Sequence, residues 1–341
     1  MLRRRFIQSV AGIAVFGRMG YRHKEKLQES DLTPKPTKAE LLPSVAAAKG
    51  TNLDSAERIL KTALDAMGGI GRFVRPGQIV AIKPNASWAY PPGTASSTDP
   101  DVLRALILMV REAGAQRILV MDHCALDPGT TECLQVSGIG AVVDELGVEK
   151  VFPDRYVSPR RLFTAIDLSK GKVFQKLGVI KAAVEADVRI NMAVAKSHMV
   201  TTVTMCLKHM MGFLQWPNAL HARLDQGIAD LNSPSPIRAQ LHILEAIRVR
   251  LPGGGRLQAG GKETEITHPD KIKRLNEIVV GTDPVLMDAF GCLNYFSRAP
   301  KHLAHLNRAF EMGLGEMDPE VAKREGRLRV SFVSDWPCSA T

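Results

Sequence analysis

The cysteines of this sequence lack the spacing of a metal or cluster site. None of the five forms a C-x-x-C pair, which argues against a zinc ribbon and against a ferredoxin-type iron–sulfur cluster. Cys124 and Cys133 could pair in an oxidising compartment, whereas Cys206 and Cys292 are expected to be buried thiols. The number of cysteines is odd, so their pairing does not follow from the sequence.

Aromatic residues and long apolar runs are also scarce. Aromatics make up 5% of the 341 residues, so a core must be built from aliphatic side chains and methionine. No apolar run reaches the roughly 18–20 residues that a membrane-spanning helix needs. Hydrophobic residues nevertheless make up 45% of the chain and charged residues 23%, a balance typical of globular proteins.

Several enzyme motifs are missing. The sequence has no G-x-S-x-G, no P-loop, no H-x-x-x-H and no H-E-x-x-H, so it gives no support to a serine hydrolase, a P-loop enzyme or a zinc protease. The only D-x-D, Asp99-Pro100-Asp101, is predicted to be a helix start, with a capping aspartate followed by proline at the first helical position.

The net charge of +10 is concentrated near the N-terminus. Residues 1–50 contain ten basic and four acidic residues, which leaves 35 basic and 31 acidic residues for the rest of the chain. A nucleic-acid surface needs a clustered basic face. Basic and acidic residues are nearly equal in number beyond residue 50, which does not predict such a face. We therefore expect no nucleic-acid partner.

Residues 1–20 are predicted to be a signal segment. Arg3, Arg4 and Arg5 precede a short apolar stretch that ends at Phe16, the pattern of an export signal. The run Arg-Arg-Arg-Phe-Ile at 3–7 resembles the twin-arginine motif, which implies the twin-arginine export machinery as a partner and a periplasmic or other extracytoplasmic location. That route carries folded proteins, often with a cofactor inserted. The alternatives are a solvated basic N-terminus and a misassigned start codon.

The cleavage position of this signal stays open. No Ala-x-Ala follows Phe16, and Arg18 and Arg22 come next, so an uncleaved signal could tether the chain to the inner membrane. Residues 21–50 contain three prolines and mixed charge, which predicts a tether. The α/β domain is expected over 51–335, with a division into two lobes near 150–175 as the alternative.

Strands and helices alternate after the tether. A helix over 54–67 precedes a strand over 78–83, a helix over 100–113 that ends at Gly114, and a strand over 117–122. The second helix is long enough to cross over the sheet, so the two strands should be parallel. The elements expected further on are helices over 140–146, 176–186, 201–212, 237–249, 284–289, 301–312 and 319–324, and strands over 188–194, 277–280 and 328–333. The pattern predicts the α/β class, a mainly parallel sheet with helices on both faces plus loop-rich insertions.

Polar residues follow the strand ends, which is where parallel sheets bind ligands. The catalytic candidates are Asp122, Lys196 and His198, and the substrate-binding candidates are Lys83, Asn85, Thr204, Lys208 and Asp283. Thr204 and Lys208 are four residues apart on a predicted helix, so they should share a face. The lysines and a helix N-terminus predict an anion site. A divalent metal on His123, His198, Asp283 or Asp288 is the alternative, and the cofactor stays open.

In their order along the chain, these motifs resemble a known family. They are Ile-Lys-Pro-Asn at 82–85, the Thr-Asp-Pro helix start at 98–100, Lys-Ser-His at 196–198, TMCLKHMMG at 204–212 and Gly-Thr-Asp-Pro at 281–284. They resemble the bacterial and archaeal domain of unknown function 362 over residues 75–315. Ser197 replaces a usual threonine and His209 a usual asparagine, and the four-cysteine module of some members is absent. The resemblance implies a fold and a site location but no reaction.

Two hypotheses follow. The first is an enzyme for a small anionic substrate. The lysines bind the anion, His198 acts as general acid or base, and an aspartate orients His198 or holds a metal. The second is a non-catalytic protein that binds a ligand or cofactor at the same place, for example for a redox partner. A carboxylate paired with His198 would favour the enzyme. A homodimer is compatible with either hypothesis.

Overall fold

A computed structural model describes residues 42–124, 129–154, 160–253 and 269–335. The predicted signal segment, most of the predicted tether and Cys338 lie outside these residues. Within them, no helix combines the length and the apolar character that crossing a membrane requires.

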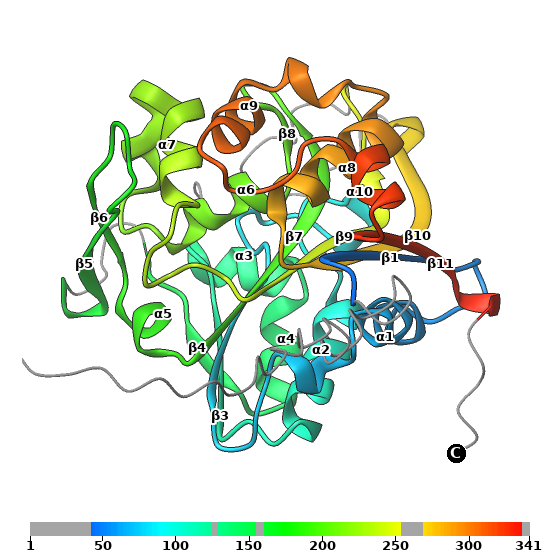
Figure 1. Ribbon diagram of the computed structural model, residues 1–341. Helices are drawn as coiled ribbons and strands as arrows, with labels where there is room; N and C mark the ends of the chain where they lie inside the picture. The colour runs from blue at the N-terminus through cyan, green and yellow to red at the C-terminus, as the bar shows by residue number, and fades with distance from the viewer. Residues whose placement is uncertain (1–41, 125–128, 155–159, 254–268, 336–341) are drawn as a thin grey trace, which may run out of the picture. The chain divides into compact units, whose positions relative to one another are not determined.

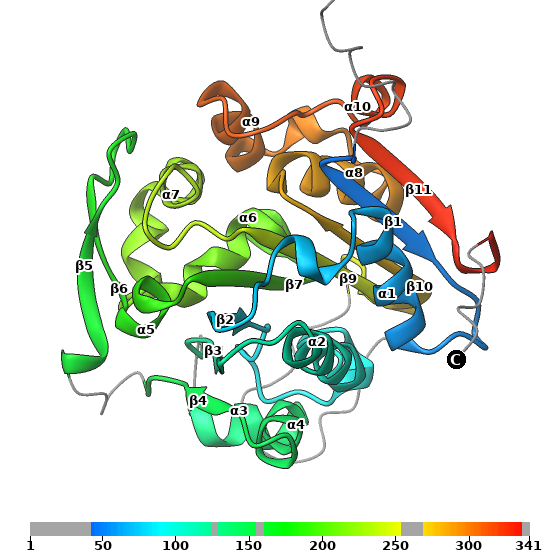
Figure 2. The same cartoon turned by 60° about the horizontal axis from the view of Figure 1, so that its bottom comes forward.

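The centre of the fold is a nine-stranded sheet in the order β11-β1-β10-β9-β7-β2-β3-β4, with β8 paired to β7 (Figures 1 and 2). Neighbours from β4 through to β9 are parallel, as are β1 and β11, whereas β10 is antiparallel to both β9 and β1. The predicted α/β class with a mainly parallel sheet is confirmed. The strands are β1 Val45–Lys49, β2 Ile79–Lys83, β3 Arg117–Met121, β4 Glu149–Val151, β7 Val188–His198, β8 Thr202–Thr204, β9 Leu241–Arg250, β10 Ile272–Gly281 and β11 Leu328–Phe332.

Helices cover both faces of the sheet. In Figures 1 and 2, α1, α2 and α4 lie on one face, and α6, α8 and α9 lie on the other. The α-helices are α1 Ala56–Ala66, α2 Pro100–Glu112, α3 Thr130–Val136, α4 Ile139–Glu145, α5 Lys181–Glu185, α6 Cys206–His209, α7 Leu224–Leu231, α8 Pro284–Phe296, α9 Ala304–Glu311 and α10 Pro319–Arg324. A separate two-stranded sheet pairs β5 Phe163–Asp167 with β6 Lys176–Ile180.

The alternation of side chains along each strand divides the core in two. On β2, Val80 and Ile82 belong to the cluster under α1 and α2, whereas Ala81 belongs to the cluster under α6 and α8. Successive strand residues point to opposite faces, so Lys83 shares the face of Ala81. A charged side chain therefore lies on the buried face that α6 covers.

The unit formed by β2, α2 and β3 follows the sequence prediction. Asp99 caps α2 by accepting a hydrogen bond from Asp101 N, and Pro100 occupies the first turn. The strands β2 and β3 on either side of α2 are parallel neighbours, as predicted. These signals are local, so one short stretch of sequence is enough to define them.

Four other elements differ from the prediction. The predicted helix over 237–249 is the strand β9, because an apolar run buried on both faces has no period that distinguishes the two structures. The predicted helix over 176–186 is β6 followed by the short α5. The predicted helix over 201–212 divides into β8, α6 and a short 3-10 turn, and β7 continues to His198. Finally, β1 lies within the predicted tether and pairs with both β10 and β11.

Candidate functional site

A buried ion pair joins the ends of β2 and β3. Lys83 Nζ lies 2.8 Å from Asp122 Oδ1, and both side chains are 0% exposed. Asp122 Oδ2 accepts a hydrogen bond of 2.8 Å from Ala86 N. Burial lowers the pKa of Lys83, and the charge of Asp122 opposes that shift. Both residues were predicted to belong to the site, and the structure shows that they form an ion pair with each other.

Hydrogen bonds link the ion pair to a series of buried polar side chains that crosses the sheet. Lys83, Asn191 and His242 are direct neighbours in the register of β2, β7 and β9, so their side chains lie in one row on the α6 face. His209 of α6 bridges the row, with Nε2 2.9 Å from Lys83 Nζ and Nδ1 2.6 Å from Asn191 Oδ1. Asn191 Nδ2 in turn lies 3.0 Å from His242 Nδ1.

These hydrogen bonds fix the proton positions of His209. Lys83 has only donors, so His209 Nε2 must accept, and His209 Nδ1 then donates to Asn191 Oδ1. Burial and the charge of Lys83 lower the pKa of His209 well below its usual range. A neutral imidazole satisfies both neighbours, so His209 has a positioning role.

Lys196 lies near the end of β7, with its amine held by neutral oxygens. Its Nζ donates to Asn85 Oδ1 at 3.1 Å and to Ser96 O, and the residue is 7% exposed. Burial, followed by the charges of Lys208 and Arg250, lowers the pKa of Lys196 to about 7. Within the described residues, no carboxylate forms an ion pair with this amine.

Lys208 on α6 is another lysine whose pKa is lowered. Burial and the charge of Lys83 lower its pKa to about 8, and the described part of the chain offers it no ion-pair partner. Arg250, at the end of β9, donates from Nη1 to Ser96 Oγ at 3.0 Å. We call Lys196, Lys208 and Arg250 the cationic rim, because the positive charges of Lys208 and Arg250 both act on Lys196.

Within the described ranges, His198 has no carboxylate partner of the kind that would favour a proton-transfer role. Its Nδ1 accepts from Val200 N and Thr201 N, both at 3.2 Å. Burial and the charges of Lys208 and Lys196 lower its pKa to about 3. The ring is therefore neutral at ordinary pH, and its proton lies on Nε2, where it can be donated to an acceptor.

Two further candidates have buried atoms for which the described residues provide no hydrogen-bond partner. Thr204 lies on β8, paired with Lys196 across the β7–β8 hairpin, so it does not share a helix face with Lys208 as predicted. Its Oγ1 is buried and has no hydrogen-bond partner. His123 Nδ1 donates to Leu214 O at 2.8 Å, and its Nε2 is buried without a partner.

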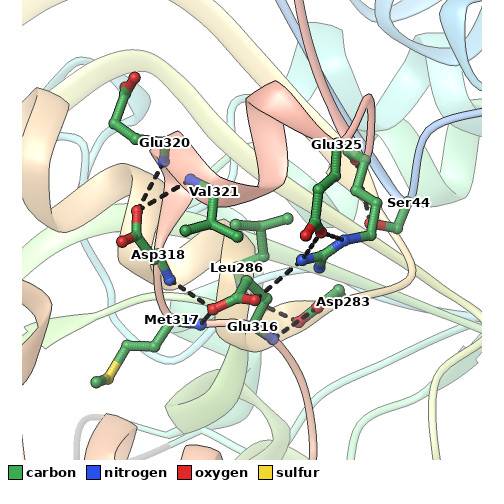
Figure 3. A network of polar contacts seen from close by, with 10 residues as sticks. Ser44, Asp283, Leu286, Glu316, Met317, Asp318, Glu320, Val321 and Glu325 are labelled. Carbon is green, nitrogen blue, oxygen red and sulfur yellow. Dashed lines mark hydrogen bonds and ion pairs between the residues drawn. The ribbon is translucent and has the colours of Figure 1, made fainter. Parts of the chain in front are cut away.

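Asp283 is not part of this site. The strand before it, β10, runs antiparallel to β9, so its carboxyl end points toward the edge where β9 begins. Asp283 caps α8 by accepting from Leu286 N and also accepts from Glu316 N, both at 2.9 Å (Figure 3). The prediction that Asp283 lies with Lys83 and Lys196 is wrong, because it assumed that this strand is parallel to the others.

Asp288 holds the start of α6 in place. Its carboxylate accepts from Cys206 N at 2.7 Å and Leu207 N at 3.0 Å, and burial raises its pKa to about 7. The predicted metal candidates do not gather, and no group of three or more His, Cys, Asp or Glu in the described ranges could hold a metal ion. Asp288 instead positions the helix that carries Lys208 and His209.

Sequence reasoning missed Arg250 and Ser96. Arg250 follows the segment that was predicted to be a helix, so it was not counted among the strand ends. Recognition of β9 as a strand would have placed Arg250 at the same edge as Lys196, with which it is paired in register. Ser96 contributes its backbone carbonyl, which no side-chain pattern reveals.

A family model covers the part of the chain that contains these residues. A family model described as Domain of unknown function (DUF362) matches residues 80–293, which include every residue of the cationic rim and the Lys83–Asp122 pair. A thylakoid-associated protein of Synechocystis sp. is 32% identical over 160 residues. That match covers 45% of this chain and 44% of the other protein, so this chain spans less than half the length of its curated relative.

Two solved structures are distantly similar. The lactate racemase apoprotein from Thermoanaerobacterium thermosaccharolyticum is 15% identical, with a TM-score of 0.43 over 64% of this chain and 53% of that one. A protein from Thermotoga maritima is 14% identical, with a TM-score of 0.34 over 55% of this chain and 50% of that one.

Proposed function

The chain belongs to the DUF362 family of domains of unknown function, and from the geometry of the site we propose that it is an enzyme acting on a small organic anion. The anion, a carboxylate or a phosphate, binds at the cationic rim. Lys196 and Lys208 hold its charge, and His198 donates a hydrogen bond from Nε2. Asn85 and Asp122 support the site through their contacts with Lys196 and Lys83.

One observation carries the proposal. Lys196 is buried and Lys208 is half-buried, the charge of Lys208 lowers the pKa of Lys196, and no carboxylate among the described residues forms an ion pair with either amine. A bound anion would supply the missing negative charge and raise both pKa values toward their ordinary range. Amines whose pKa values lie near 7 and 8 are also suited to proton transfer at neutral pH. We assign the acid–base chemistry to the lysines, since His198 has no carboxylate partner in the part of the chain that the structure describes.

The affinity for an anion should depend on pH and on Lys208. Both amines are protonated below their pKa values of about 7 and about 8, so binding should be tightest near pH 6 and weaken as the pH rises through 8. Calorimetric titration with oxalate and with inorganic phosphate measures this. Lys208→Met should weaken binding about tenfold, the loss of one modest ionic contact.

An exposed lysine provides the matched control. Lys323, near the end of α10, is exposed, and Lys323→Met should leave the affinity and its pH dependence unchanged. If Lys208→Met binds both anions as the unmodified chain does, or if affinity is constant between pH 6 and 9, the proposed anion site is wrong.

A further inference from the structure

A pocket lies at the edge of the sheet opposite to the cationic rim. Its volume is about 610 Å³, within the range of sites that hold small organic ligands. The strands β7 and β9 begin at this edge, and β10 ends there because it runs antiparallel to β9. Arg189 of the pocket and Lys196 of the rim both lie on β7, and their spacing along an extended strand corresponds to roughly 20 Å.

Three arginines line this pocket, and no acidic residue does. We call it the arginine pocket after Arg72, Arg189 and Arg238. The ion pairs that arginines form within the described ranges involve none of the three. The charge of Asp187 acts on Arg189, but the Asp187 carboxylate already accepts a hydrogen bond of 2.8 Å from Ile79 N. The residues that line the pocket therefore leave its positive charge uncompensated.

Neutral groups hold two of these arginines in place. Arg189 is 8% exposed, and its Nη1 donates to Ala186 O at 2.6 Å. Arg72 donates from Nη1 to Met67 O at 2.8 Å, and its guanidinium carbon lies 5.5 Å from the centre of the Phe73 ring. A carbonyl oxygen and an aromatic ring orient a guanidinium group without neutralising it.

The third arginine and a hydroxyl group provide further donors. Arg189 Nε donates to Arg238 O at 3.0 Å, so the Arg189 side chain contacts the backbone of Arg238. The Arg238 side chain itself is exposed and has no ion-pair partner in the part of the chain that the structure describes. Ser235 also lines the pocket, and the described residues offer its buried Oγ no hydrogen-bond partner.

We propose that the arginine pocket binds the phosphate group of a small organic phosphate ester. A phosphate carries up to two negative charges and three acceptor oxygens, and guanidinium groups match its geometry. Three arginines suit this charge better than the single charge of a carboxylate. The exposed Arg72 and Arg238 hold the phosphate, and the buried Arg189 adds its charge.

The size and the walls of the pocket favour an ester over inorganic phosphate. A volume of about 610 Å³ is larger than inorganic phosphate needs. Phe73, Pro234 and Pro236 line the pocket beside the arginines, and such apolar side chains pack against the organic part of a ligand. This site shares no residue with the cationic rim, so it is independent of the proposed function.

Calorimetric titration of the full chain with AMP, adenosine and inorganic phosphate tests the proposal. AMP should bind about tenfold more tightly than inorganic phosphate, and adenosine, which lacks the phosphate, should give no measurable binding. Arg238→Met and Arg72→Met should each weaken AMP binding about tenfold, the loss of one charge-assisted contact. The control Arg298→Met removes an exposed arginine outside the pocket and should leave AMP binding unchanged.

Modification by phenylglyoxal, which reacts with accessible arginines, locates the bound ester in the unmodified chain and does not depend on the folding of any variant. Peptide mass spectrometry then measures the extent of reaction at each arginine. Saturating AMP should slow the reaction of Arg72 and Arg238 about fivefold and leave that of Arg298 unchanged. Equal reaction with and without AMP at all three arginines would overturn the proposal.

The variants separate this site from the cationic rim. Lys208→Met should leave AMP binding unchanged, and Arg238→Met should leave oxalate binding unchanged. If AMP binding depends on Lys208 and not on Arg238, the ester binds at the rim and the arginine pocket is not its site. AMP that binds no more tightly than inorganic phosphate would overturn the ester as the ligand. If AMP binding depends on Arg238 while oxalate does not bind, this proposal stands and only the proposed function fails.

Discussion

Replacement of Lys83 by methionine should lower the free energy of unfolding by about 3–5 kcal/mol, the usual cost of removing one partner of a buried ion pair. Methionine has nearly the length of the lysine side chain, so the loss comes from charge rather than from a cavity. Asp122 would remain 0% exposed without its cation, and His209 would lose the donor at Nε2. Urea unfolding followed by circular dichroism measures the loss.

An exposed ion pair provides the control for this variant. Lys61 pairs with Asp65 on the surface of α1, and such pairs contribute roughly 0–1 kcal/mol. Lys61→Met should therefore change stability little. Lys83→Met combined with Asp122→Asn should recover part of the loss, because no charge remains buried. If Lys83→Met costs less than about 1 kcal/mol, the ion pair is not buried as described.

Replacement of Gly212 by alanine should be similarly damaging, for a steric reason. A Cβ atom at this position would lie 2.0 Å from Asp122 Oδ1 and 2.6 Å from Lys83 Nζ. Both side chains are fully buried, so neither can move away without breaking the ion pair. We expect a loss of about 3 kcal/mol or more, the sum of overpacking and a weakened buried pair. Thermal and urea unfolding measure it.

The matched control is Gly71→Ala. No atom lies within 4 Å of a Cβ at Gly71, so this substitution should change stability by no more than about 0.5 kcal/mol. A double-mutant cycle gives a sharper result. Gly212→Ala and Lys83→Met act on the same contact, so their combined effect should be smaller than the sum of the two. Strict additivity would show that the glycine acts elsewhere.

The sequence predicts this fold best where its signals are local. The cap at Asp99 with Pro100 and the apolar strand before Lys83 define β2 and α2 without knowledge of the rest of the chain. The run that forms β9 gives no such signal, because a strand buried on both faces has no alternation. Because this run was predicted to be a helix, Arg250 was not recognised as lying at a strand end and was not included in the predicted site.

Strand direction and register limited the prediction of the site. The placement of Asp283 with Lys83 depended on β10 being parallel, and no local pattern encodes the direction of a strand. The row formed by Lys83, Asn191 and His242 depends on the pairing of three strands that are far apart in the sequence. By contrast, Asp122 directly follows β3 and Lys196 lies near the end of β7; both strands have clear local signals, and the structure places both residues near the same edge.

Lys196 and Lys208 are proposed to bind an anion through amines whose pKa values are lowered in the free protein, and an NMR titration of the lysine side chains tests this most directly. The Cε and Hε shifts of the two residues, assigned with Lys196→Met and Lys208→Met, are followed from pH 5 to 11 with and without oxalate. We predict midpoints near 7 and 8 in the free protein, both of which rise when oxalate binds. Midpoints near the ordinary lysine value of about 10.4, unchanged by oxalate, would contradict the account.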